Sequence, residues 1–146
     1  MRTFFSFLFI SVLFVACNGE KSAKNVESTS KESTMSKKET VGAFLGAVIT
    51  GDTVSMRQLA RADYIQHNPF IPTGLEPFID MLPVLQENGT TADNVRMFED
   101  GDYVFVHNIW KNAKPFGADE MVSFDIIRLD SDGKVAEHWD AMTAMV

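Results

Sequence analysis

Apolar residues in the first half of the folded region recur at the three- and four-residue spacing of α-helices. The first such run follows Ser36, which forms a capping-box pattern with Glu39 and so predicts where the helix begins. A second, shorter run covers residues 54–60. A third follows Thr73, which with Glu76 again has the capping-box pattern. These runs predict three helices.

The pattern changes to a period of two in the second half, which is typical of β-strands. Turn residues separate the strands, and they include the hairpin signal Asp100-Gly101. The predicted strands cover residues 95–99, 103–110, 121–129 and 134–142. Helices followed by an antiparallel meander indicate the α+β class.

Two of these strands, 103–110 and 121–129, are apolar on both faces. A small antiparallel sheet usually keeps one face in contact with water. The three predicted helices can cover only one face of the sheet. We therefore expect the second face to be buried in a homodimer.

The first sixteen residues have the features of a secretory signal peptide. Arg2 precedes an apolar run that is too short to span a bilayer. The run ends at Ala16-Cys17, which resembles the lipobox of bacterial lipoproteins, although Phe14 stands where that motif prefers Leu. The resemblance implies that Cys17 is acylated and becomes the mature N-terminus. The alternative is an ordinary secretory signal with an incidental cysteine.

Residues 17–36 are rich in Ser, Thr, Lys, Glu and Asn, and such a segment cannot bury enough apolar surface to order itself. We expect a flexible tether there and a folded domain over 37–146. The lipobox then places the protein in the bacterial cell envelope, lipid-anchored and either periplasmic or surface-exposed. Since Cys17 is the only cysteine, no internal disulfide can form, and the domain depends on its hydrophobic core.

The charge balance is acidic, with 13 Lys and Arg against 20 Asp and Glu and a formal net charge of −7. Such a balance disfavours nucleic acid as a partner, because phosphates require a basic surface. It also disfavours electrostatic attachment to anionic lipid. Membrane attachment is expected through lipidated Cys17.

Several short motifs follow one another along the folded region. They are Tyr64-Ile65-Gln66-His67-Asn68-Pro69, Gly74, Gly101-Asp102-x-Val104, Asp125-Ile126-x-Arg128 and Gly133-Lys134-x-x-Glu137-His138-Trp139-Asp140. Together they resemble the SnoaL-like group of the NTF2-like superfamily, over about residues 39–146. Ile127 stands where the family often has Phe, and Ala136 where it often has Val; both are packing changes.

The resemblance implies a cone in which three N-terminal helices pack in a strongly curved antiparallel sheet, with a pocket at the open end. The family includes polyketide cyclases that close rings by intramolecular aldol condensation. It also includes isomerases, hydrolases, dehydratases and members without known chemistry. A shared fold does not fix the function.

Asp125 is the main candidate for chemistry. Its neighbours in the strand are apolar, and a carboxylate in such surroundings is costly to ionise. A carboxyl group of this kind can remove a proton from carbon next to a carbonyl and return it elsewhere. The alternative is a structural role for Asp125, paired with an arginine or a histidine.

Other polar residues could act with Asp125. His107 could orient it or polarise a carbonyl, or be a satisfied core residue. His138 and Asp140 share one face of the last strand, so Asp140 could fix the tautomer of His138; alternatively, they form a polar pair at the end of the strand.

The segment from Tyr64 to Asn68 should reach the rim of the pocket, and the resemblance places it near the cleft. Tyr64 could donate a hydrogen bond into the pocket or anchor the second helix. His67 and Asn68 could belong to the site or only cap the turn.

These residues predict a cofactor-independent enzyme that acts on a small apolar carbonyl compound. Its acid/base chemistry would be of the aldol cyclase, isomerase or hydrolase type. Asp125, His107 and His138 would be its catalytic residues. The alternatives are a non-catalytic lipoprotein that binds a small apolar molecule, and a protein–protein module. We predict no cofactor and no metal, because the sequence has no Gly-rich phosphate loop and the three histidines lack metal-ligand spacing.

Overall fold

Helix α1 (Lys37–Thr50) begins at the predicted capping box: Ser36 Oγ accepts from the backbone of Glu39, and the Glu39 carboxylate accepts from the backbone of Ser36. It ends at Gly51, which has a left-handed φ of 70°. Helix α2 (Thr53–Leu59) follows directly, and the side chain of Asp52 caps it. The computed structural model describes residues 35–145, so the predicted signal peptide and Cys17 lie outside the described residues.

Strand β1 (Ala60–Gln66) is an element that the sequence analysis missed, because we predicted only a helix end and a turn in this region. β1 pairs in parallel with the last strand, so the sheet is mixed and the prediction of a wholly antiparallel sheet is wrong. Tyr64 and Gln66 are buried and Ile65 lies between them on the exposed side, which is the alternation of a strand.

Helix α3 (Leu75–Glu87) begins one residue later than its capping-box pattern suggested. Its N-cap is Gly74, which makes no side-chain cap. Thr73 Oγ1 instead accepts a hydrogen bond from the backbone of Gln66 at 3.1 Å, so this hydroxyl ties the helix entrance to β1. The predicted cap at Thr73 is therefore wrong.

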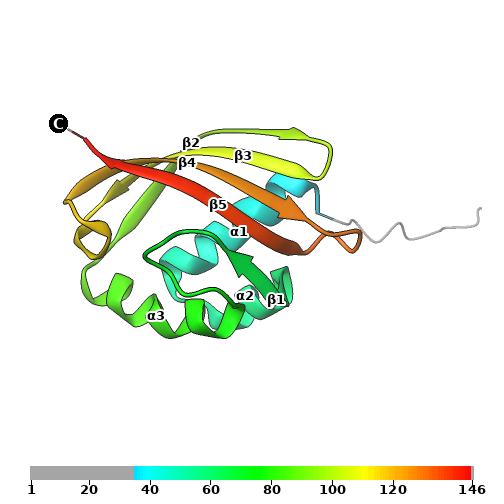
Figure 1. Cartoon of the computed structure of the whole chain (residues 1–146), viewed down its shortest axis with the longest axis horizontal. Coiled ribbons are helices and arrows are strands. Elements are labelled where there is room, and N and C mark those ends of the chain that lie inside the picture. Colours follow the sequence, from blue (N-terminus) through cyan, green and yellow to red (C-terminus); the bar gives the residue numbers. More distant parts are fainter. Residues whose placement is uncertain (1–34, 146) are drawn as a thin grey trace, which may run out of the picture. The chain divides into compact units, whose positions relative to one another are not determined.

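The remaining strands form an antiparallel meander, as predicted. They are β2 (Thr91–Asp100), β3 (Tyr103–Lys111), β4 (Glu120–Leu129) and β5 (Val135–Ala144), with the short 3-10 helix η1 (Lys114–Phe116) between β3 and β4. The order across the sheet is β1-β5-β4-β3-β2. In Figure 1 the helices lie against one face of this curved sheet, which confirms the α+β class.

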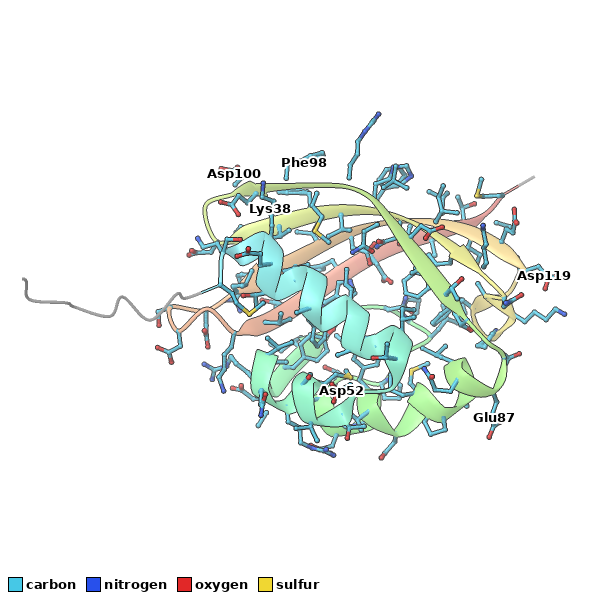
Figure 2. The ribbon with its side chains drawn as sticks, turned by 180° about the vertical axis from the view of Figure 1, so that it is seen from behind. Lys38, Asp52, Glu87, Phe98, Asp100 and Asp119 are labelled. Carbon is cyan, nitrogen blue, oxygen red and sulfur yellow. The ribbon has the colours of Figure 1, made fainter. Side chains whose placement is uncertain are left out.

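The two faces of the sheet differ in what covers them. The inner face packs on the helices, and the rings of Phe44, Tyr64 and Phe78 form the centre of the core. The outer face carries large apolar side chains, among them Phe98 and Phe124, which are 60% and 61% exposed. Figure 2 shows Phe98 pointing away from the body of the protein. Within residues 35–145, no helix has the length and hydropathy that crossing a membrane requires.

Candidate active site

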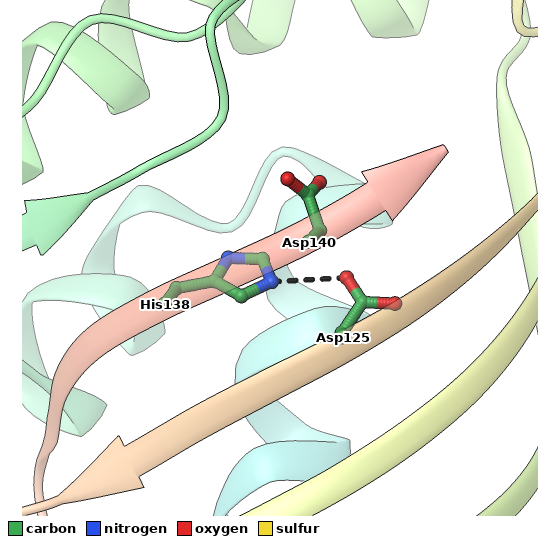
Figure 3. A group of neighbouring side chains, drawn as sticks. All are labelled: Asp125, His138 and Asp140. Carbon is green, nitrogen blue, oxygen red and sulfur yellow. Dashed lines mark hydrogen bonds and ion pairs between the residues drawn. The ribbon is translucent and has the colours of Figure 1, made fainter. Parts of the chain in front are cut away.

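A cluster of polar side chains lies on the inner face of the sheet, within the otherwise apolar core. Asp125 on β4 and His138 on β5 are 2% and 5% exposed. Asp140, two residues further along β5, pairs with Asp125 in the strand register and is half-buried. Figure 3 shows the three side chains on the same side of the two strands. Asp125 therefore faces inward, as the sequence analysis required for a chemical role.

Asp125 is held by donors at both carboxylate oxygens. Oδ1 lies 2.9 Å from His138 Nε2. Oδ2 accepts from Asn108 Nδ2 at 2.8 Å and from Ser123 Oγ at 2.6 Å. The Ser123 hydroxyl itself accepts from Trp110 Nε1 at 2.9 Å, which directs its proton toward Asp125. Such a set of donors stabilises an ionised carboxylate inside the core.

The other ring nitrogen of His138 faces β1. Tyr64 Oη and Gln66 Nε2 each lie 3.1 Å from His138 Nδ1. Burial, followed by the nearby Asp140 and Asp125 carboxylates, raises the pKa of Tyr64 well above its ordinary value. Tyr64 therefore stays a protonated hydroxyl and remains a hydrogen-bond donor. Both nitrogens of His138 are thus committed to protein groups.

Asp140 differs from Asp125 in having one carboxylate oxygen to spare. Its Oδ2 accepts from Asn68 Nδ2 at 2.6 Å, while its buried Oδ1 has no hydrogen-bond partner among the described residues. Burial raises the pKa of Asp140; the Asn68 amide and His138 lower it, and the Asp125 charge adds to the increase. A half-buried acid with a free oxygen and a raised pKa can exchange a proton with a bound molecule.

Two of the predicted site residues lie on the other face of the sheet. The His107 ring stacks on Phe124 with centroids 4.9 Å apart, and these two residues oppose each other in the β3–β4 register. His107 consequently cannot orient Asp125, and that prediction is wrong. The reason is the two-residue period of the strand, which places neighbouring positions of the ladder on opposite faces.

His67 is the second such residue. Its Nε2 lies 2.9 Å from Glu137 Oε1, and its ring stacks on Trp139 with centroids 4.8 Å apart. The pKa of Glu137 is lowered, first by the hydrogen bond with His67 and then by Arg128. His67 therefore belongs to a partly exposed surface network, whereas Asn68, the next residue, turns inward to Asp140.

The structure thus brings together five predicted residues and adds four that sequence reasoning missed. The predicted ones are Asp125, His138, Asp140, Tyr64 and Asn68; the additional ones are Gln66, Asn108, Ser123 and Trp110. A signal existed for two of these additions. The spacing of two between Tyr64, Gln66 and Asn68 places Gln66 on their face once β1 is recognised, and Ser123 stands two residues before Asp125.

Asp125, His138 and Asp140 also match the composition of a metal site, since one ligand atom from each lies within 4.8 Å of the others. A metal there would need the lone pair of one ring nitrogen of His138, and Nε2 is the nitrogen that lies 2.9 Å from Asp125 Oδ1. The prediction of no metal therefore stays a prediction, and it depends on which nitrogen of His138 carries a proton.

One surface groove of the described residues includes a member of the cluster in its lining. This groove lies on the outer face of the sheet, and the member is Asp125, which is only 2% exposed. That groove of about 400 Å³ is otherwise lined by residues such as Phe98, Phe105 and Phe124.

Comparisons with known proteins agree on the fold. No family model matches the chain, and no curated protein matches it as a relative. An NTF2-like protein from Cytophaga hutchinsonii has a TM-score of 0.63 at 13% identity, covering 77% of this chain and 94% of its own. IdmH, a candidate polyketide cyclase from Streptomyces antibioticus, has a TM-score of 0.59 at 20% identity, covering 74% of this chain and 92% of its own.

A third solved structure is of a protein named for a different reaction. It is an LEH-like epoxide hydrolase from M. tuberculosis, with a TM-score of 0.59 at 17% identity, covering 73% of this chain and 82% of its own. At these identities the likeness shows the fold alone. Residues 35–145 therefore share their fold with these three proteins.

Proposed function

We propose that this protein is a cofactor-independent enzyme that performs acid/base chemistry on a small, largely apolar carbonyl compound. One observation carries the proposal: Asp140 has a raised pKa and an unpartnered buried oxygen, beside the hydrogen-bonded pair of His138 and Asp125. The sequence analysis gave the acid/base role to Asp125. The contacts favour Asp140 instead, because both oxygens of Asp125 already have donors.

In this reaction Asp140 Oδ1 takes a proton from the carbon next to the substrate carbonyl. The electron pair of the broken C–H bond moves onto the carbonyl oxygen and forms an enolate. Asp140 then returns the proton to the same or another atom, so no oxidant or reductant is needed. The Asn68 amide donates a hydrogen bond to Asp140. Once substrate separates the two side chains, this amide can donate to the enolate oxygen instead.

The named neighbours support this class of reaction without fixing the substrate. One is a candidate polyketide cyclase and another an epoxide hydrolase. Polar atoms of the site lie within an apolar core formed by residues such as Leu82, Trp110 and Phe116. An apolar compound with one carbonyl group is the substrate class that suits this environment.

A non-catalytic binding role is the second candidate, and the closed state of the site favours it. Asp125 and His138 make all their hydrogen bonds with protein groups, which suits a structural network under a ligand as well as a catalytic one. In that case Asp140 would only fix the orientation of the ligand.

Hydrogen exchange at carbon separates the two candidates. Small apolar ketones and β-diketones are incubated in D₂O with the full chain, produced with Cys17→Ser to prevent acylation. Loss of the α-hydrogen signal is then followed by NMR. We expect exchange above the buffer rate, and we expect Asp140→Asn to slow it by about 10²–10⁴-fold.

Asp119→Asn is the matched control, because Asp119 is exposed and pairs with Lys114 at the surface. It should leave exchange unchanged. Binding of these ketones without exchange above the buffer rate would establish the binding role. Equal exchange by the wild type and Asp140→Asn would remove Asp140 from the mechanism.

The location of the protein is a separate proposal that rests on the sequence. We propose that Cys17 is lipidated after removal of residues 1–16 and that the domain faces the periplasm or the cell surface. Labelling of growing bacteria with a palmitate analogue tests this: label should enter the wild type and be absent from Cys17→Ser. Label in both proteins would exclude Cys17 as the acceptor.

A further inference from the structure

The amide group of Gln66 has only one orientation that satisfies its surroundings. Its Oε1 accepts a hydrogen bond from the backbone of Asn68 at 3.0 Å. The Nε2 end must then face the other way, toward Tyr64 Oη at 3.0 Å and His138 Nδ1 at 3.1 Å. Since an amide nitrogen donates and cannot accept, both contacts of Nε2 are donated bonds.

This orientation determines the role of His138 Nδ1. A proton on Nδ1 would point at the Gln66 N–H, and the two donors would repel. The Tyr64 hydroxyl can also donate to Nδ1. Nδ1 must therefore be an acceptor, and the single proton of the neutral imidazole lies on Nε2, where it is donated to Asp125 Oδ1 at 2.9 Å.

We propose that Gln66 is a positioning residue that keeps His138 neutral, with its proton on Nε2. Two carboxylates lie beside the ring and would otherwise favour an imidazolium. Gln66 opposes this because its Nε2–H points at Nδ1 and would repel a second ring proton there. The consequence for the proposed function, on which this last step rests, is that Asp140 remains the group of the cluster that changes its protonation state.

The groups that face the ring come from three strands. They are Asp125 from β4, Asp140 from β5, and Tyr64 and Gln66 from β1. Asp125 and Asp140 favour a charged ring, while Tyr64 and Gln66 present donors and disfavour it. The same arrangement denies a metal ion the lone pair of Nε2, because that nitrogen is protonated. We predicted from the sequence that Asp140 could fix the tautomer of His138; the contacts assign this role to Gln66.

Nitrogen NMR of the ring tests the proposal without any substrate. The full chain with Cys17→Ser is labelled with ¹⁵N-histidine, and its three histidines give three pairs of ring signals. For His138 we expect a pyridine-type Nδ1 and a pyrrole-type Nε2.

Gln66→Glu replaces the amide donor that faces His138 Nδ1 with a carboxylate oxygen, which accepts a hydrogen bond from Nδ1. We expect both nitrogens of His138 to become pyrrole-type, which is the signature of an imidazolium. Gln86→Glu is the matched control: Gln86 is exposed on α3, so the same change of charge there should leave the signals of His138 unchanged. Should the buried glutamate prevent folding, Tyr64→Phe provides the second test, because Gln66 alone should then keep Nδ1 pyridine-type.

Three results would overturn the proposal. They are an imidazolium or a protonated Nδ1 in the wild type, an unchanged neutral ring in folded Gln66→Glu, and protonation of Nδ1 in Tyr64→Phe. None of these measurements involves a carbonyl compound. The tautomer assignment can therefore hold in a protein without the proposed enzyme activity. Equally, the activity can be found in a protein in which the tautomer assignment is wrong.

Discussion

At the scale of single residues, the cluster separates two carboxyl groups by what surrounds them. Asp125 is almost fully buried but receives donors from Asn108, Ser123 and His138. Asp140 is less buried but has one oxygen without a partner in the described chain. The apolar neighbours of Asp125 suggested from the sequence that it is the reactive residue. Its donors leave Asp140 as the carboxylate with a free oxygen, and those donors could not be predicted before the register of the strands was known.

The raised pKa of Asp140 gives a pH dependence to stability. Because the folded state holds this proton more tightly than the unfolded state, the stability that it contributes is fully present below the unfolded value, about 3.9. That contribution is lost as the pH rises through the folded pKa. Asp140→Asn cannot ionise, so its free energy of unfolding should increase relative to the wild type over this range. Urea unfolding at a series of pH values measures the difference.

Asp63→Asn provides a control with the opposite sign. The Arg61 guanidinium lowers the pKa of Asp63, so this variant should lose stability relative to the wild type as the pH rises. Parallel curves for Asp140→Asn and the wild type would contradict the raised pKa. They would then leave only the unpartnered oxygen in support of Asp140.

At the scale of secondary structure, the period of the apolar positions was sufficient for most elements. Helix α1 and the meander β2–β5 were predicted because each has a long run of one period and clear turn residues. Strand β1 was missed because Arg61, Ala62 and Asp63 interrupt its alternation with exposed residues. Its partner, β5, is distant in the sequence, and no local pattern indicates a parallel pair.

The same limit explains which parts of the site were predicted. Asp125, His138 and Asp140 were found because they are polar residues in apolar strands. Gln66 was not, since it lies in the unrecognised strand. His107 was misplaced because the face of a strand that packs on the helices cannot be identified from a sequence that is apolar on both faces.

One glycine inside helix α1 and the glycine that caps its end should respond to substitution in opposite directions. Gly51 ends the helix with a φ of 70°, and an added Cβ would lie 3.3 Å from the side chain of Gln86. Gly51→Ala should therefore lower the free energy of unfolding by about 1 kcal/mol. Gly46 is an exposed position inside the helix with free space around it, so Gly46→Ala should raise the free energy of unfolding by about 0.5–1 kcal/mol.

Urea unfolding of both variants at one pH measures the pair. Changes of the same sign would contradict the assignment of Gly51 as a left-handed cap. Both substitutions introduce alanine at the same helix. A general effect of alanine on helix formation would therefore change the free energy of unfolding in the same direction in both variants.

At the scale of the whole molecule, the outer face of the sheet is its largest unexplained feature. It carries Phe98, Phe105 and Phe124, and a groove of about 400 Å³ runs among them. Contiguous apolar surface of this kind marks an interaction site more often than a monomer surface. We predicted a homodimer through this face from the sequence, and it stays a prediction.

Phe124→Asp tests the homodimer directly. Phe124 lies on the central strand β4 and is 61% exposed, so its replacement should leave the core intact. In a dimer that buries this face, a charge at its centre should weaken association by about 100-fold, as expected for the loss of a central aromatic contact. Sedimentation of the full chain with Cys17→Ser, over a range of concentrations, measures the effect.

Val84→Asp is the matched control, because Val84 is 46% exposed on α3, which packs against the opposite face of the sheet. It should leave association unchanged. A wild type that sediments as a monomer at every concentration would exclude the homodimer. The outer face would then need another partner, and the protein–protein role that the sequence left open would gain support. A dimer that survives Phe124→Asp but not Val84→Asp would place the interface on the helices and leave the outer face free.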